Sequence, residues 1–300
     1  MMADVTRRPP AAVLAAFDVD TAILEPLSGG QGMAWRAGRL VLKPLDMSLE
    51  ALAWQEAVLS DIAEDGFRLA RPVRSRRGEL AIAGWSAWQW LGGQHLPGRW
   101  ADIAAVGERF HRATAHIPPP SWHRRRTDPF ATADRAAWDA EVLERFTSLP
   151  VIAQLAAQLR PVQGRDQLIH GDLSGNVLFR QRLAPGIIDL SPYWRPPLFA
   201  TAVIAVDAMV WEGADQSILA ILGGHPDAPQ YLIRAAIFRA VMDRLCNPQR
   251  HEPPPWWTSL LYVTAQLCHL AASAPTAAVS PRSSGKPCEV DPGPPDVSRD

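Results

Sequence analysis

The chain has 300 residues, a formal net charge of −1 and 47% hydrophobic residues, so it is long enough for two lobes or domains with substantial cores. Without a basic excess or an apolar run of membrane-spanning length, neither a nucleic acid nor a membrane is an expected partner. The three cysteines are widely spaced and predict neither a disulfide framework nor a zinc site. The first residues lack the apolar core of a signal peptide, and we expect a cytoplasmic protein.

A glycine-dense turn is the first notable feature. After a weakly helical stretch at residues 11–26, the segment 27–35 leads through this turn towards an apolar strand that ends at Lys43, with a hairpin turn at Ala37-Gly38 between them. Because glycine has no Cβ, backbone N–H groups in such a turn can approach phosphate oxygens, although a plain hairpin would contain the same residues. Lys43 and Lys286 are the only lysines of an arginine-rich chain, which favours a chemical role for Lys43.

The next element is a predicted helix over residues 48–64. Its leucine and isoleucine residues fall near one face, and Ser48 is suited to cap the first turn. The helix carries Glu50 and Glu56, and either carboxylate could keep the Lys43 ammonium oriented, whereas a glutamate on an exposed helix face needs no such role.

A hairpin and an aromatic strand complete the first part of the chain. The hairpin has its turn at Arg77-Gly78, and the tryptophan-rich run from Trp85 to Leu91 ends at Gly92-Gly93. The tryptophans in this run can fill a core, and stacking on a flat ligand is the alternative.

The chain from residue 92 to residue 273 is predicted to be mainly helical apart from one polar stretch. The predicted helices cover residues 100–115, 134–146, 151–159, 198–211, 228–246 and 256–273. Asp134 is suited to cap the second helix. Asp207 stands inside an almost wholly apolar helix, where a neighbouring arginine or backbone group should satisfy it. Residues 274–300 offer almost nothing to bury, and we expect them to be disordered.

The polar stretch lies within residues 168–179. Two short apolar runs bracket a loop that carries His170, Asp172 and Asn176, and a third run delivers Asp189, which predicts strand, loop, strand, turn and strand. Phosphoryl transfer needs an aspartate that takes the proton of a hydroxyl, and an amide and a second carboxylate that hold Mg²⁺ against nucleotide phosphates. Asp172, Asn176 and Asp189 supply these groups in that order, although each short motif alone would fit a surface turn. His170 is expected to brace the loop backbone.

These motifs resemble those of the aminoglycoside phosphotransferase family, which has the protein-kinase-like fold. The resemblance rests on His170-Gly-Asp172, Asn176 and Ile188-Asp189. It implies an α+β bilobal fold with a small β-rich N-lobe over residues 1–91, a larger and mainly helical C-lobe over residues 92–273, and the tail 274–300. In that family the asparagine follows the aspartate by five residues, whereas here it follows by four.

The resemblance also implies roles for individual residues. Asp172 would be catalytic, and Asn176 and Asp189 would hold the metal. The glycine turn and Lys43 would bind the phosphates of ATP, Glu56 would be the partner of Lys43, and the run before Gly92 would contact adenine. The residues that it thereby assigns to nucleotide binding are Gly29, Gly30, Gln31, Gly32, Lys43, Glu56, Trp88, Trp90 and Leu91.

We therefore expect an ATP- and Mg²⁺-dependent phosphotransferase that moves the γ-phosphate to a hydroxyl of a small molecule, with its oligomeric state left open. The acceptor is expected to be a sugar, an amino sugar or a related metabolite. An aminoglycoside is a further candidate, but such polycations need an acidic pocket, and only the scattered Asp207, Glu212, Asp215 and Asp243 are available. The compressed glycine turn and the short spacing from Asp172 favour one alternative, a nucleotide-binding regulator without turnover. A nucleotidyl transferase acting on a protein is the other.

Overall fold

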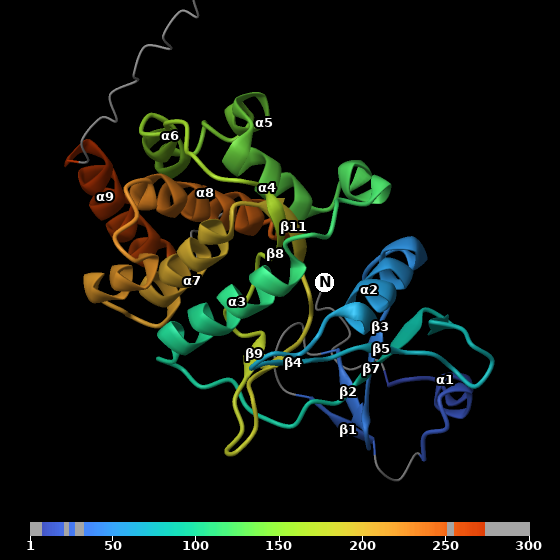
Figure 1. Ribbon diagram of the computed structural model, residues 1–300. Helices are drawn as coiled ribbons and strands as arrows, with labels where there is room; N and C mark the ends of the chain where they lie inside the picture. The colour runs from blue at the N-terminus through green and yellow to red at the C-terminus, as the bar shows by residue number, and fades with distance from the viewer. Residues whose placement is uncertain (1–7, 21–23, 28–32, 251–254, 274–300) are drawn as a thin grey trace, which may run out of the picture.

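An antiparallel sheet frames the first lobe of the computed structural model, which describes residues 8–20, 24–27, 33–250 and 255–273 (Figure 1). The strand order is β1 (Leu24–Pro26), β2 (Trp35–Ala37), β3 (Leu40–Pro44), β7 (Trp85–Gln89) and β5 (Pro72–Val73), with β6 (Ala81–Ile82) paired to β7. The predicted hairpin between β2 and β3 is confirmed, and Gly38 makes its turn with a φ of +62°. The short helix α1 (Ala11–Ala16) and the sheet share one small apolar core.

The helix α2 (Leu49–Asp61) is the longest element of this lobe among the described residues. Its predicted cap is confirmed, because Ser48 Oγ accepts a hydrogen bond from the backbone N–H of Ala51 at 3.1 Å. The helix buries Leu52, Gln55 and Leu59 on one face. That face is turned towards the second lobe, where the loop that follows β10 lies.

Helices dominate the second lobe. They are α3 (Trp100–Thr114), α4 (Pro129–Trp138), α5 (Ala140–Glu144), α6 (Pro150–Ala156), α7 (Pro197–Trp211), α8 (Ala228–Cys246) and α9 (Trp257–Ser273), with 3₁₀ helices at Ser121–Arg125 and Gln216–Leu222. The core lies around α7 and α8, and α8 packs against α4, α7 and α9. The expected bilobal arrangement, with a small β-rich lobe before a larger helical one, is confirmed.

One helix boundary differs from expectation. We predicted a single helix over residues 134–146 with Asp134 as its N-cap, and this is wrong. The helix α4 begins earlier, because Pro129 suits a first turn and Asp128 accepts from the backbone N–H of Ala131 at 3.0 Å. Asp134 lies buried in the middle of α4, where it pairs with Arg195.

Two small β ladders hold the polar loop. In one, β8 (Gln167–His170) pairs antiparallel with β11 (Pro192–Arg195). In the other, β10 (Gly186–Ile187) lies between β9 (Val177–Leu178) and β4 (Arg68–Leu69). Because β4 comes from the first third of the chain, this ladder ties the two lobes together directly beside the loop.

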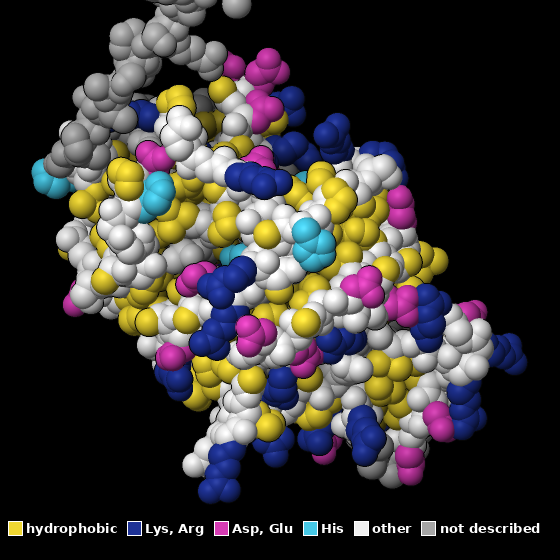
Figure 2. Space-filling view, in the orientation of Figure 1, with side chains coloured by type: hydrophobic (Ala, Val, Ile, Leu, Met, Phe, Trp, Pro, Cys, Tyr) yellow, Lys and Arg dark blue, Asp and Glu magenta, His cyan; other side chains and the backbone are white. Residues whose placement is uncertain are grey.

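An interlobe cluster of apolar side chains supports the same junction. Its members come from α2, β4, α3 and the strands around the loop, and they include Leu52, Phe67, Ile103, Phe110, Leu173, Val177 and Ile187. At the surface, Figure 2 shows basic and acidic side chains interspersed over one face, in keeping with the near-zero net charge. No helix among the described residues is long and apolar enough to span a membrane.

Candidate active site

The loop between β8 and β9 is anchored by a buried histidine. The backbone N–H of His170 donates to His111 Nε2 at 3.1 Å, and its ring Nδ1 accepts from the backbone N–H of Asp172 at 3.2 Å. Its Nε2 lies 3.1 Å from the carbonyl oxygen of Ile188, so the neutral tautomer with a proton on Nε2 satisfies both ring nitrogens. Burial lowers the pKa of His170 and favours this neutral form. The expected bracing role is confirmed, and it couples Asp172 to the strand that leads to Asp189.

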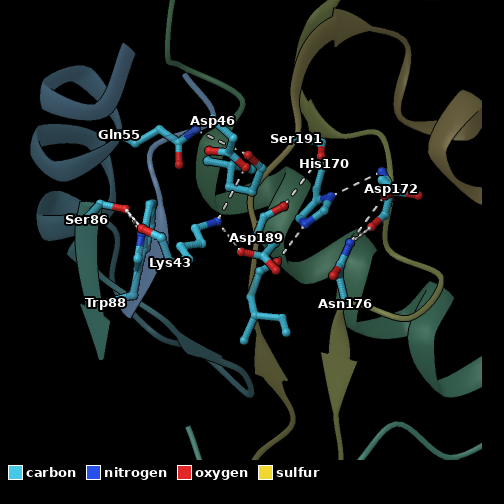
Figure 3. Close-up of polar contacts among 12 residues, drawn as sticks. Lys43, Asp46, Gln55, Ser86, Trp88, His170, Asp172, Asn176, Asp189 and Ser191 are labelled. Carbon is cyan, nitrogen blue, oxygen red and sulfur yellow. Dashed lines mark hydrogen bonds and ion pairs between the residues drawn. The ribbon is translucent and has the colours of Figure 1, made fainter. Parts of the chain in front are cut away.

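Asn176 lies close to Asp172 despite the short spacing. Its Nδ2 donates to the backbone carbonyl of Asp172 at 2.7 Å and lies 3.4 Å from Oδ2 of the same residue. Gly175, with a φ of +86°, gives the loop the tight turn that this needs. In Figure 3 the side-chain oxygen of Asn176 points towards the carboxylate of Asp189. The loop therefore holds the amide oxygen of Asn176 on the side of Asp189, while its amide nitrogen binds Asp172.

Lys43 meets Asp189 across the junction of the lobes. Its Nζ lies 2.7 Å from Asp189 Oδ1 and 3.9 Å from Asp46 Oδ2, and it stands 4.8 Å above the ring centroid of Trp88 (Figure 3). Asp189 has a φ of +49°, a left-handed conformation that aspartate tolerates better than most residues. Residues that are 146 positions apart thus form one charged centre.

Glu56 does not lie beside Lys43, and the expected Lys43–Glu56 pair is wrong. The two carboxylate oxygens of Glu56 instead accept from Arg74 at 2.6 and 2.5 Å. The preceding residue, Gln55, occupies the inward face, where its Nε2 donates to the carbonyl oxygen of Leu190 at 3.3 Å. One residue along a helix rotates a side chain by about 100°, which separates the two positions.

The three residues expected to contact adenine, Trp88, Trp90 and Leu91, lie in three different environments. Trp88 is 4% exposed, donates from Nε1 to Ser86 Oγ at 3.0 Å and forms the floor under Lys43. Trp90 stacks with the guanidinium of Arg36 at 4.8 Å, and Leu91 lies in the segment that leaves β7 for the second lobe. Gly29, Gly30, Gln31 and Gly32 lie outside the described residues.

Sequence reasoning missed one residue of the site, Arg239 of α8. Its Nη2 donates to Asp172 Oδ1 at 2.7 Å, and its Nε and Nη2 also donate to the two oxygens of Asp207 at 2.8 and 2.5 Å. The expectation that a neighbouring arginine satisfies Asp207 is therefore confirmed. A buried aspartate in an apolar helix signals that a cation must lie nearby, but the sequence does not say which arginine supplies it.

The donor set fits a hard divalent cation bound together with phosphate. Among the described residues no cluster of three or more histidine, cysteine or acidic side chains could hold a metal by itself. Magnesium commonly takes one or two carboxylates and completes its shell with phosphate oxygens and water. One carboxylate and one amide, from Asp189 and Asn176, match this habit, and Lys43 beside them offers a point charge for phosphate.

Comparisons with known proteins identify the family and the fold. The model of the phosphotransferase enzyme family matches residues 30–193, which span both Lys43 and Asp189. An aminoglycoside phosphotransferase from Alicyclobacillus acidocaldarius has a similar structure, with a TM-score of 0.55 and 17% identity, covering 89% of this chain and 95% of that chain. Spectinomycin phosphotransferase APH(9)-Ia, solved with ADP and spectinomycin, has a TM-score of 0.53 and 15% identity, covering 86% and 94%. Choline kinase LicA from Streptococcus pneumoniae has a TM-score of 0.54 and 11% identity, covering 82% and 93%.

At these identities the structural similarity establishes the fold alone, which is the kinase-like bilobal one. No protein of curated function matches the sequence significantly.

Proposed function

This chain belongs to the phosphotransferase enzyme family and is a phosphotransferase with an alcohol group as acceptor, and on that premise we propose that it moves the γ-phosphate of ATP, with Mg²⁺, to a hydroxyl of a small molecule. The observation that carries the proposal is the convergence of Lys43 from one lobe with Asp172, Asn176 and Asp189 from the other. Phosphoryl transfer relies on positioning and electrostatic stabilisation, and these residues supply both.

In the proposed reaction Asp172 orients the acceptor hydroxyl. Arg239 engages Oδ1 of this carboxylate, so Oδ2 takes the proton as the hydroxyl O–H bond breaks, the new O–P bond forms and the bond to ADP breaks. Asn176 and Asp189 would hold Mg²⁺, which when bound offsets charge on the phosphates. Lys43 would leave Asp189 for the nucleotide phosphates, a change of partner that needs only a rotation of its flexible side chain.

The remaining nucleotide contacts are part of the proposal. Gly29, Gly30, Gln31 and Gly32, which the sequence predicts to form a turn, would bind the phosphates with backbone N–H groups. The backbone around Trp90 and Leu91 would pair with adenine, since this segment follows β7, which pairs with the Lys43 strand β3, and leads into the second lobe. Trp88 would support the site from below through its contact with Lys43.

The acceptor is proposed to be a sugar, an amino sugar or a related metabolite rather than a polycationic aminoglycoside. The four acidic residues considered for a cationic pocket all have partners. Asp207 pairs with Arg239, Glu212 accepts from Trp100 Nε1 at 2.7 Å, Asp215 accepts from the backbone N–H of Ser217 at 2.8 Å, and Asp243 pairs with Arg250 at 2.7 Å. Because arginines already neutralise Asp207 and Asp243, these two carboxylates add little net negative charge for a polycation, whereas a neutral or singly charged acceptor does not need it.

The test is ADP release by the purified chain with ATP and Mg²⁺, across a panel of sugars, amino sugars and aminoglycosides. We expect acceptor-dependent release that is lost in Asp189→Ala. Asp172→Asn should lower kcat by about 10²- to 10⁴-fold, the usual contribution of a proton acceptor, and leave the dissociation constant of ADP unchanged. Unchanged turnover in Asp172→Asn would remove the assignment of this residue.

Product masses separate the alternatives. Addition of phosphate to the acceptor supports the proposal, and addition of AMP to a protein would establish a nucleotidyl transferase instead. Nucleotide binding without turnover on any acceptor would favour a regulator.

A further inference from the structure

We propose that Arg239 is a positioning residue that fixes one oxygen of Asp172, with Asp207 as its buried counter-ion, so that the acceptor hydroxyl meets the other oxygen. The inference rests on the proposed function for its catalytic consequence. The contact between Arg239 and Asp172 is observed in the structure and does not depend on the proposed function.

The geometry joins three elements through one guanidinium. Asp207 lies on α7, Arg239 on α8 and Asp172 in the loop after β8. The Nε and Nη2 atoms of Arg239 form a bidentate pair with Asp207, and Nη2 also reaches Asp172 Oδ1 at 2.7 Å. The side chains of Asp207 and Arg239 are each 6% exposed, whereas that of Asp172 is 36% exposed. The buried pair therefore contacts the accessible carboxylate from below.

The surroundings restrict Arg239 to this orientation. Its guanidinium lies 5.6 Å from the ring centroid of Trp211 and 5.2 Å from that of Phe238. Although burial favours its neutral form, the carboxylates of Asp207 and Asp172 raise the pKa of Arg239, so the group stays charged. A planar guanidinium held in this way fixes the orientation of the Asp172 carboxylate in addition to balancing its charge.

Stability alone does not account for such a pair. Burying two charges costs desolvation energy, and apolar residues of similar size often serve the fold equally well or better. The structure offers an internal comparison, since Arg195 and Asp134 form a second buried bidentate pair at 2.9 and 2.7 Å. The guanidinium of Arg195 stacks on Trp138, and no contact of this pair reaches Asp172, Asn176 or Asp189. The two pairs are thus alike in chemistry, and only one is connected to the site.

The contact assigns separate tasks to the two oxygens of Asp172. Oδ1 accepts from Arg239, and Oδ2 lies 3.4 Å from Asn176 Nδ2, on the side of the amide proposed to hold the metal. A proton transferred from the acceptor hydroxyl therefore arrives at Oδ2. Loss of Arg239 would let the carboxylate rotate, and a misplacement of about 1 Å can cost about 10²-fold in rate.

The first test replaces the whole pair, because removal of one partner would leave a buried charge. Asp207→Leu with Arg239→Met is compared with the matched control Asp134→Leu with Arg195→Met, using the acceptor found in the panel. Both proteins should keep the far-UV spectrum and a cooperative melting transition. Only the first should lose about 10²-fold in kcat, with the KM for ATP and for the acceptor little changed. The single variant Arg239→Lys should keep a higher kcat than the double variant Asp207→Leu with Arg239→Met. A lysine ammonium can still bind the Asp172 carboxylate, although it does not fix the plane of that group. A kcat within about threefold of the wild type, or an equal loss in both double variants, would overturn the proposal.

The second test needs no substrate, so it separates this inference from the proposed function. In a ¹⁵N-resolved spectrum the Nε–H signal of Arg239, identified by its disappearance in Arg239→Lys, should be protected from exchange with solvent. Asp172→Asn should shift this signal, and Asp134→Asn should leave it in place. If the Arg239 signal does not shift in Asp172→Asn, the two side chains are not in contact in solution. That result would overturn the inference, whatever the chain phosphorylates.

Discussion

Lys43 is the residue whose surroundings bear most directly on the proposed binding of the nucleotide phosphates. It is held by Asp189 and rests on Trp88, so its orientation depends on a carboxylate of the opposite lobe. On α2 the side chain that faces the second lobe is Gln55 and not a glutamate. Its uncharged amide donates to the backbone carbonyl of Leu190 and does not pair with Lys43. The lysine is thus positioned by Asp189, the proposed metal ligand, and by the ring of Trp88.

This environment predicts unequal effects for two substitutions. Glu56→Gln should leave the KM for ATP and the melting temperature nearly unchanged, because Glu56 pairs with Arg74, whose side chain is half exposed, and not with Lys43. Lys43→Met should raise the KM for ATP at least about tenfold, since it removes the charge proposed to bind phosphate. Steady-state kinetics with varied ATP compares them, and a large KM increase in Glu56→Gln would contradict the structure.

At the scale of elements, the ladder of β8 and β11 fixes the loop that carries Asp172. Gly171 follows β8 directly, and a Cβ at this position would overlap the ring of Tyr193. Tyr193 is 2% exposed and packs edge-on against Phe238 at 5.8 Å, so it has no room to withdraw. The sheet thus holds the start of the loop through close packing as well as through hydrogen bonds.

Gly171→Ala should therefore cost about 1–3 kcal/mol of unfolding free energy, as overpacking of a core usually does, and should also lower kcat because Asp172 is the next residue. The control is Gly78→Ala in the turn between β5 and β6. There the φ of +81° strains an alanine but the space is open, and the hydrogen bonds of Gly78 go to Ser75 and Arg74. Urea titration and kcat are measured on both proteins. We expect the control to lose stability without losing kcat, and equal losses of kcat would contradict the local explanation.

For the molecule as a whole, two buried histidines contribute to the dependence of stability on pH. Burial lowers the pKa of His111 from 6.5 to about 3, and the nearby His170 acts in the same direction. Above pH 6.5 this group is neutral in both states, so its full contribution to stability is present. As the pH falls below 6.5, the unfolded chain binds a proton that the folded chain excludes until about pH 3.

The unfolding free energy should therefore fall between pH 6.5 and about 3, with His111 contributing about 1.4 kcal/mol per pH unit. Urea denaturation at successive pH values measures this slope. His111→Asn should be less stable than the wild type at neutral pH, because it alters the contact with the backbone of His170, and the difference should narrow as the solution is acidified. Parallel curves for the two proteins would show that the pKa of His111 is not lowered in the folded state.

The sequence by itself determined the features that depend on near neighbours. The Ser48 cap, the buried helix α7 and the succession of strands around Asp172, Asn176 and Asp189 all follow from propensity and spacing within a few residues. The same local rules misplaced the start of α4, because Asp128 and Pro129 form a stronger initiation signal than Asp134.

Only the tertiary structure decided which partners these residues have. A turn of about 100° per residue along α2 gives the inward position to Gln55 and sends Glu56 to Arg74. The Asp207 carboxylate required a cation, yet only the packing of α8 on α7 selects Arg239 and carries its guanidinium to Asp172. The pairing of Lys43 with Asp189 likewise depends on the junction between the lobes. Contacts between distant segments are set by the packing of whole elements, and no pattern within a single segment encodes them.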